Sequence, residues 1–200
     1  MINSTPISFC AKIPVAKCQI FDKTKNNYVP ATVYEYDCND IEDIYEIGKL
    51  DESWRFGEDI ASKMHGKFLK RNTPKAENNI HYYSIKKGKE VVGICQTQEN
   101  ENNIGVKLIE SSHNGKYKYA GQAMLASLGV KALDNDNQTL KICGALPEAY
   151  KFYEDTCGFR CTTKGYSHFG YQFETTRDEL SDFVTRTEKR TNGKIINLDA

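Results

Sequence analysis

An excess of charge of either sign is absent from this 200-residue sequence. Lys and Arg together number 27, Asp and Glu together number 27, and the formal net charge is zero. Proteins that bind nucleic-acid duplexes or anionic membrane surfaces normally carry a basic excess that displaces counterions. The balance therefore argues against nucleic acid and against a membrane surface as partners.

Long apolar runs are also missing. A membrane-spanning helix needs about 20 consecutive apolar residues, and the longest apolar stretch, near Met124 to Val130, is interrupted by Ser127 and Gly129. The first residues, Met1 to Lys17, lack the basic cluster and apolar core of a signal peptide. We therefore expect a cytoplasmic protein.

Cysteines at metal-binding spacing are the third absence. No two of the seven cysteines stand in a C-x-x-C pattern, and the closest pair is Cys157 and Cys161. Zinc sites take ligands in tightly spaced pairs, usually with His nearby. We predict no metal, and reduced thiols that pack as small apolar residues, with Cys95 and Cys143 inside predicted strands.

The apolar residues that are present predict alternating strands and helices. Period-two patterns rich in β-branched and aromatic residues predict strands at 28–36, 81–86, 90–99, 104–109 and 139–145, and strand-like structure with a turn over 159–174. Helical spacing predicts helices after the capping pair Asn39–Asp40, from about Glu58 to Thr73, and over 121–133, 147–157 and 177–189. The first of these carries Ile41, Ile44, Tyr45 and Leu50 as its apolar residues.

This order of elements predicts a fold class. A chain of this length suits one domain with an N-terminal extension. Antiparallel hairpins followed by a helix crossover predict an α/β (α+β) fold with a mixed, mostly antiparallel sheet flanked by helices. We expect the domain to span residues 28–190, residues 1–27 to form a loosely packed leader or extra strand, and residues 191–200 to form a flexible tail.

One segment has the form of a phosphate-binding turn. Residues 118–123, Lys-Tyr-Ala-Gly-Gln-Ala, lead from a predicted strand into a predicted helix. Unpaired N–H groups at such a helix start bind phosphate, and Gly121 allows close backbone approach. Lys116 and Lys118 add positive charge beside it. Taken alone, an ordinary strand-to-helix turn with a glycine explains the segment equally well.

A second segment combines aromatic residues with a helix end. Residues 145–159 contain Phe152-Tyr153-Glu154 and end in Gly158-Phe159. By itself this is also typical of a packed helix with a glycine cap, in which Tyr153 is a core tyrosine.

Together, in this order, the two segments resemble the GNAT acetyltransferase family. Residues 118–123 are similar to the family's Arg/Gln-x-x-Gly-x-Gly/Ala pyrophosphate loop, and residues 149–159 look like its Asn-x-x-Ala-x-x-Phe-Tyr-Glu-x-x-Gly-Phe segment. The similarity spans about Glu90 to Phe159. Three departures stand out: Lys118 replaces Arg or Gln, Leu146 stands where the family often has Asn, and one extra residue separates Tyr153 from Gly158.

The resemblance implies a sheet that is splayed at its centre and flanked by about four to five helices, with acetyl-CoA in the gap between the strand ending near Ile109 and strand 139–145. It implies a set of cofactor-binding residues: Ile109, Ser111, Lys116, Lys118, Tyr119, Ala120, Gly121, Gln122 and Ala123. It also implies direct attack by an amine, with Tyr153 as general acid and Glu110 as candidate base. His113 is an alternative base, and Cys143 as a nucleophile would need a nearby His base.

The function implied is an N-acetyltransferase (N-acyltransferase) that moves an acetyl group from acetyl-CoA to an amine of a small molecule or protein. The alternatives are a catalytically inactive GNAT-like domain that binds CoA or a protein partner, and a small α/β interaction domain unrelated to the family. A homodimer is left open. One acidic set either attracts a cationic amine or forms a solvated helix face: Asp40, Glu42, Asp43, Glu46, Asp51 and Glu52.

Overall fold

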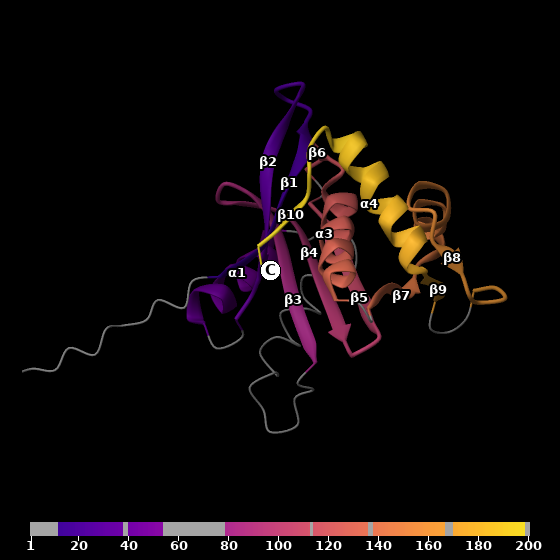
Figure 1. The fold of residues 1–200 in the computed structure, drawn as a ribbon. Coiled ribbons are helices and arrows are strands. Elements are labelled where there is room, and N and C mark those ends of the chain that lie inside the picture. The colour runs from indigo at the N-terminus through magenta and orange to yellow at the C-terminus, as the bar shows by residue number, and fades with distance from the viewer. Residues whose placement is uncertain are drawn as a thin grey trace, which may run out of the picture.

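The computed structural model describes residues 12–37, 40–53, 79–112, 114–135, 138–166 and 170–198 (Figure 1). Its strands are β1 Ile13–Asp22, β2 Asn27–Glu35, β3 Ile80–Lys87, β4 Glu90–Glu99, β5 Asn103–Ser111, β6 Tyr117–Lys118, β7 Thr139–Ala145, β8 Arg160–Cys161, β9 Tyr171–Glu174 and β10 Ile196–Asn197. Its helices are α1 Ile41–Ser53, α3 Ala120–Asp134 and α4 Arg177–Thr191, with a 3₁₀ turn at Pro147–Ala149 and a π-helical turn at Phe152–Thr156.

The strands of the described residues form one sheet. Their order is β10-β1-β2-β3-β4-β5-β7-β9-β8, and β6 pairs with β1. Within it β5 and β7 are parallel, whereas the other neighbouring pairs are antiparallel. A parallel pair needs a crossover connection, which α3 supplies. The predicted mixed, mostly antiparallel sheet is confirmed.

The sheet splays between β5 and β7. Their pairing runs from Asn103 to Val106 on β5 and from Thr139 to Ile142 on β7, and goes no further. Lys107 is an extra residue on β5, because Val106 and Leu108 pair with the adjacent residues Thr97 and Gln96 of β4. A bulge of this kind bends a strand and increases its twist. The predicted splay is confirmed, and it leaves the β7-facing edge of β5 after Lys107 without a strand partner among the described residues.

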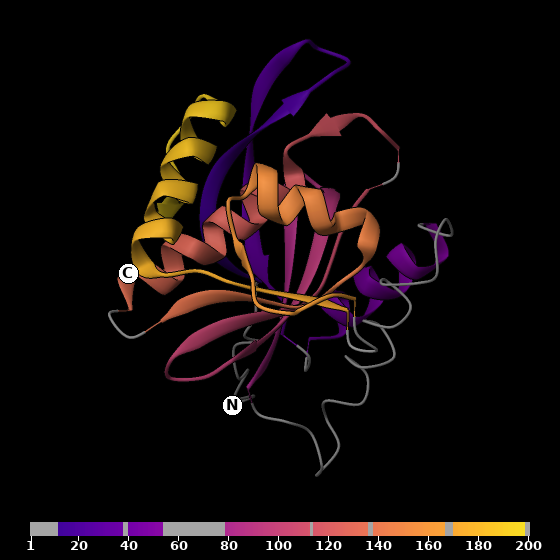
Figure 2. The same ribbon diagram turned by 90° about the vertical axis from the view of Figure 1, so that its right-hand side faces the viewer.

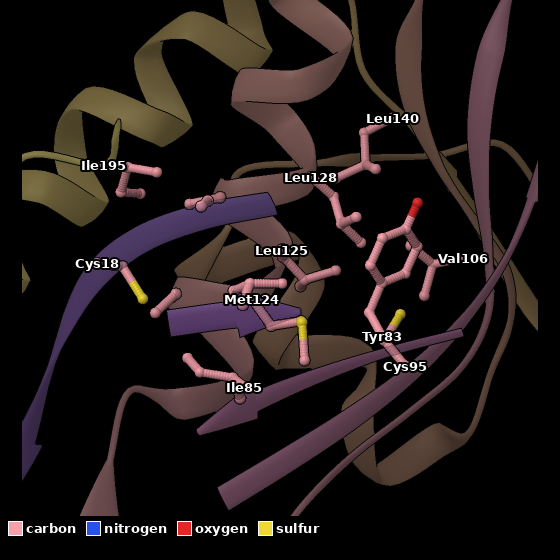
Figure 3. Packing of buried hydrophobic residues seen from close by; sticks show 14 of the residues in the cluster. Cys18, Tyr83, Ile85, Cys95, Val106, Met124, Leu125, Leu128, Leu140 and Ile195 are labelled. Carbon is pink, nitrogen blue, oxygen red and sulfur yellow. The ribbon is translucent and has the colours of Figure 1, made fainter. Parts of the chain in front are cut away.

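The main core lies between the sheet and helices α3 and α4. Figure 3 shows Met124, Leu125 and Leu128 of α3 packed among Cys18, Tyr83 and other strand residues, all of them buried. The helix predicted over 121–133 is confirmed, and its Met124, Leu125, Leu128 and Ala132 are buried. A Cβ on Gly129 would lie 3.0 Å from Leu180 of α4, so the two helices pack at close range.

A second, smaller core lies on the other face of the sheet, where α1 packs. Tyr82 joins this cluster while its neighbour Tyr83 joins the main core, as expected because successive strand residues point to opposite faces. Figure 2 shows α1 (purple) and α4 (yellow) on opposite sides of the sheet. The helix predicted after Asn39–Asp40 is confirmed, with Ile47 and Leu50 buried, whereas Tyr45 is 64% exposed.

Both ends of the described chain are more ordered than expected. Residues 13–22 form β1, whose Val15 and Ile20 are fully buried, so this part of the leader is the extra strand and is not loosely packed. After α4, Asn192 adopts a left-handed conformation that ends the helix, Ile195 enters the core, and β10 pairs with β1. The expected flexible tail is therefore wrong for residues 192–198.

The segment predicted as a helix from Pro147 is helical but irregular. Within it, the Cys157 N–H donates at 3.0 Å to the carbonyl of Phe152, which lies five residues earlier in the chain. This spacing is the π-helical pattern. Such a turn accommodates one additional residue within a helix, as the extra residue before Gly158 requires. Gly158 then ends the segment at a φ of +71°.

The helix predicted from Glu58 lies outside the described residues. Among the residues that are described, no helix is both long and apolar enough to cross a membrane.

Candidate functional site

The start of α3 presents free backbone donors. Tyr119 precedes the helix in a left-handed conformation (φ 70°), and within the described chain no side chain caps it. The N–H of Ala123 donates to the Tyr119 carbonyl at 2.8 Å. The three preceding amides, those of residues 120–122, have no partner inside the helix. No acidic residue lies in this first turn, so the positive end of the helix dipole is available to an anion.

A cavity of about 530 Å³ opens at this helix start. Its walls come from the end of β5, the start of α3 and the π-helical turn. It is lined by Val92, Ile109, Glu110, Ser111, Ser112, Tyr117, Tyr119, Ala120, Gly121, Gln122, Ala149, Phe152, Tyr153, Thr156 and Arg190. The structure thus brings together the predicted site residues except Lys116, Lys118 and Ala123.

Gly121 lines this cavity close to the end of β5. A Cβ built on Gly121 would lie 3.1 Å from the Ser111 hydroxyl oxygen. Most side-chain contacts are longer, so a larger residue would narrow the space between the helix start and the end of β5. A side chain at position 121 would therefore require the Ser111 hydroxyl to move.

The two lysines expected beside the helix start are not among the residues that line the cavity. Lys116 Nζ is 3.0 Å from Glu90 Oε2, and hydrogen bonding to Tyr117 and Glu90 raises the pKa of Lys116 above its ordinary value. Lys118 is exposed on β6, opposite Phe21 of β1. Ala123 is fully buried, and its amide is used within the helix. The charge of Lys116 is thus paired with the Glu90 carboxylate.

Tyr153 lies where two cavities meet. The second cavity, of about 210 Å³, lies between the splayed strands and is lined by Val106, Lys107, Leu108, Ile109, Ile142, Gly144, Ala145, Leu146, Ala149 and Tyr153. Tyr153 is 4% exposed and packs against Phe152 and Phe173. Burial raises the pKa of Tyr153 well above that of a free tyrosine, so its hydroxyl carries a proton at neutral pH.

The other candidates for acid–base or nucleophilic chemistry differ in position. Glu110 lines the larger cavity and stands opposite Ile94 of β4. His113 lies outside the described residues. Cys143 lines neither cavity. Its sulfur packs against Gly105 of β5, so closely that a Cβ added to that glycine would lie 3.2 Å from it. In the described ranges no cluster of His, Cys, Asp or Glu side chains could hold a metal ion.

Two members of the acidic set on α1 serve to anchor that helix. Glu46 accepts hydrogen bonds from Lys12 at 2.6 Å, Lys86 at 2.7 Å and the Tyr36 hydroxyl at 2.7 Å. Asp43 is buried, accepts a hydrogen bond from the Asp37 backbone N–H and lies 3.2 Å from Lys12. These two carboxylates therefore belong neither to a solvated helix face nor to a free cation-binding patch.

Arg190 is a charged cavity residue that the sequence did not predict. It comes from the last turn of α4, and its Nη1 donates to Gln122 Oε1 at 3.1 Å across 68 residues of sequence. Gln122 is 3% exposed, and its Nε2 donates to the Thr187 hydroxyl at 3.1 Å. No local motif marks Arg190, because only the packing of α4 on α3 places it at the cavity.

Comparison with known proteins gives matches at the level of structure. No protein-family model matches the sequence, and no curated protein matches it. A protein from Desulfovibrio desulfuricans assigned to the GNAT family of acetyltransferases superposes with a TM-score of 0.56 at 12% identity, covering 74% of this chain and 99% of its own.

Two further solved structures are similar. PaiA N-acetyltransferase from Thermoplasma acidophilum, in complex with coenzyme A, has a TM-score of 0.51 at 10% identity over 73% of this chain and 98% of its own. Aminoglycoside 6′-acetyltransferase type Ii has a TM-score of 0.52 at 11% identity, covering 72% of this chain and 96% of its own. With its splayed sheet and its crossover helix α3, this chain has the fold of the GNAT acetyltransferases.

Proposed function

We propose that the protein is an N-acyltransferase that moves an acetyl group from acetyl-CoA to an amine of a small molecule or protein. One observation carries the proposal: helix-start amides without a partner in the helix, a β5 edge unpaired among the described residues and a buried, protonated tyrosine line one cavity at the splay of the sheet. An interaction domain with no small-molecule ligand has no need of that combination.

The cofactor would lie along the cavity wall. The amides of residues 120–122 would hold its pyrophosphate, because they are unpaired at the positive end of α3. Its pantetheine arm would pair with the β5 backbone near Ile109 and Ser111, on the β7-facing edge that has no strand partner among the described residues. The fit is supported by Gly121, since even one added carbon would approach Ser111 to 3.1 Å. No metal takes part in this proposal.

The transfer step would use groups already in place. The amine nitrogen attacks the thioester carbonyl carbon, a C–N bond forms, and the C–S bond breaks. Glu110 is the candidate that accepts the amine proton, directly or through water, and Tyr153 is the candidate that donates a proton to the departing sulfur. A backbone N–H near the Lys107 bulge would stabilise the oxyanion.

The test is a thermal-shift titration of the purified protein with acetyl-CoA and CoA, using the nucleoside adenosine, which lacks phosphate, as control. A ligand at about 100 times its Kd stabilises the folded state by about 2.7 kcal/mol. We expect both CoA species to raise the melting temperature and Gly121→Glu to abolish the rise, because its carboxylate fills the gap and repels phosphate. A carboxylate at a helix start is itself favourable, so this variant should fold.

Ser181→Glu is the matched control, since it adds the same charge on an exposed part of α4 and should leave the shift intact. Absence of any shift in folded wild-type protein would refute the proposed function. A shift without acetyl transfer to any of a panel of amines would instead favour the alternative of a CoA-binding domain that has lost catalysis, consistent with Leu146 in place of Asn.

A further inference from the structure

Arg190 is an exposed residue held at the cavity by a hydrogen-bond chain whose inner link, from Gln122 to Thr187, is buried. Its Nη1 donates to Gln122 Oε1, and Gln122 Nε2 donates in turn to Thr187, each at 3.1 Å. Gln122 is the third residue of α3, so the chain fixes the guanidinium beside the same helix start that presents the free amides. The Arg190 carbonyl also accepts a hydrogen bond from the Tyr28 hydroxyl at 2.8 Å, which anchors this end of α4 to β2.

The charge of Arg190 has no carboxylate partner among the described residues. Other cations near the core are matched: Lys116 pairs with Glu90, and Lys131 pairs with Glu99. Arg186, one turn earlier on α4, instead donates to the Cys157 carbonyl at 2.9 Å. Of the residues that line the larger cavity, the charged ones are Glu110 and Arg190. The guanidinium therefore supplies positive charge at the cavity wall formed by α3 and α4.

A guanidinium in this setting suits phosphate. Arg carries five N–H donors in a planar fork that matches two phosphate oxygens at once. The hydrogen bond from Arg190 to Gln122 uses one of these five donors. The amides of residues 120–122 and the guanidinium would approach one anionic group from two sides. A single phosphate can accept from both, because each of its oxygens has more than one lone pair.

We propose that Arg190 is a cofactor-binding residue that contacts the pyrophosphate of CoA together with the start of α3, and that Gln122 positions it. The inference rests on the proposed function, because it concerns the same cavity. It adds a contact from α4, which lies beyond both sequence segments that resemble the GNAT family.

The test measures the dissociation constants of CoA and of 3′-dephospho-CoA by calorimetry. Both ligands carry the pyrophosphate, and CoA alone carries the 3′-phosphate. We expect Arg190→Gln to weaken both by about tenfold and by equal factors, as for loss of a charge-assisted hydrogen bond at a partly exposed site. Lys189→Gln, the neighbouring exposed cation outside the cavity, should change neither.

Two further variants separate charge from position. Arg190→Lys keeps the charge and loses the fork, so its affinity should fall between those of the wild type and Arg190→Gln. Gln122→Met keeps the backbone amide and removes the acceptor that holds Arg190, so it should also weaken both ligands, by less than Arg190→Gln does. Equal melting temperatures without ligand establish that the compared variants are folded.

The outcomes distinguish the two proposals. If wild-type protein binds neither ligand, both the proposed function and this inference are overturned. If it binds both and Arg190→Gln binds them equally well, this inference alone fails. If Arg190→Gln weakens CoA and leaves 3′-dephospho-CoA unchanged, Arg190 contacts the 3′-phosphate, and the pyrophosphate assignment is wrong.

Discussion

Among single residues, Tyr153 joins two properties that seldom occur together. Its ring is buried against Phe152 and Phe173, yet it contributes to the walls of both cavities. The burial that raises its pKa keeps its hydroxyl protonated through neutral and mildly alkaline pH. A tyrosine in this state can donate a proton to a departing thiolate but is a poor base, which is why we place the base elsewhere.

We predict that Tyr153→Phe lowers kcat by about 10²–10⁴-fold, the range typical for loss of a general acid. The Kd for acetyl-CoA should change little, because the ring and its packing remain. Tyr150→Phe is the matched control: its hydroxyl donates to Glu154 at 2.8 Å and lines neither cavity. Steady-state kinetics with an accepted amine test this, and equal rates for wild type and Tyr153→Phe would remove Tyr153 from the mechanism.

At this scale the sequence predicted which short segments lie together at one cavity. Gly121 and Tyr153 lie in short segments whose residue types alone suggest a helix start and an aromatic helix, and the fold brings both to one cavity. Lys116 shows the limit of such prediction, since its partner Glu90 lies 26 residues away, on β4. Arg190 shows it more strongly, because its position depends on how α4 packs.

Among the secondary-structure elements, α3 differs between its two ends in how its backbone groups are capped. Its first turn stays uncapped by side chains within the described chain and so remains open to a ligand. Its last turn is bound by Arg177, whose Nη2 donates to the Leu133 carbonyl at 2.7 Å and whose Nη1 donates to the Asn135 carbonyl at 2.9 Å. A cation is favourable at this negative end of the helix dipole, and these hydrogen bonds stabilise α3 without occupying the cavity.

We predict that Arg177→Ala lowers the free energy of unfolding by about 1.5–3 kcal/mol, the range for hydrogen bonds to a charged group. The Kd for CoA should stay near that of the wild type, because Arg177 acts at the end of α3 away from the cavity. Urea denaturation gives the first quantity and calorimetry the second. Lys189→Ala, an exposed site on α4, is the control, and a larger effect at Lys189 than at Arg177 would contradict this account.

Element boundaries were predictable where one physical signal dominates. Strands β4 and β7 match the apolar runs at 90–99 and 139–145. The segment from Pro147 was predicted as one helix, whereas the structure has a 3₁₀ turn followed by a π-helical turn. The π-helical turn also depends on the tertiary packing of Tyr153 and Cys157 in the main core. Short pairings such as β6 with β1 lack enough residues for a periodic pattern and depend on long-range contacts.

At the scale of the whole molecule, β1 is paired on both of its edges. On one edge β1 pairs with β2 along its length, and on the other it pairs with β10 at Ala16–Lys17 and with β6 at Phe21–Asp22. An unpaired strand edge invites association with other chains, and here short strands from distant parts of the sequence cover part of that edge. The β6 contact also supports the chain just before Tyr119 and the start of α3.

We predict that Ile195→Ala lowers the free energy of unfolding by about 2–5 kcal/mol, the range for truncating a buried isoleucine. Its neighbour Ile196 is the matched control: Ile195 is 7% exposed and Ile196 is 54% exposed, so Ile196→Ala should change stability by less than about 0.5 kcal/mol. Urea denaturation of both variants tests whether residues 192–198 belong to the folded domain. Similar, small effects at both positions would restore the original expectation of a loose tail.

The position of Arg190 in α4 also has a consequence for synthesis. The chain emerges from the ribosome N-terminus first, so the sheet through β7 and the start of α3 are available before α4 has been made. During that interval the cavity lacks the wall that carries Arg190, and Gln122 lacks both of its partners, Thr187 and Arg190. The nascent protein therefore completes the walls of this cavity only as its last helix docks.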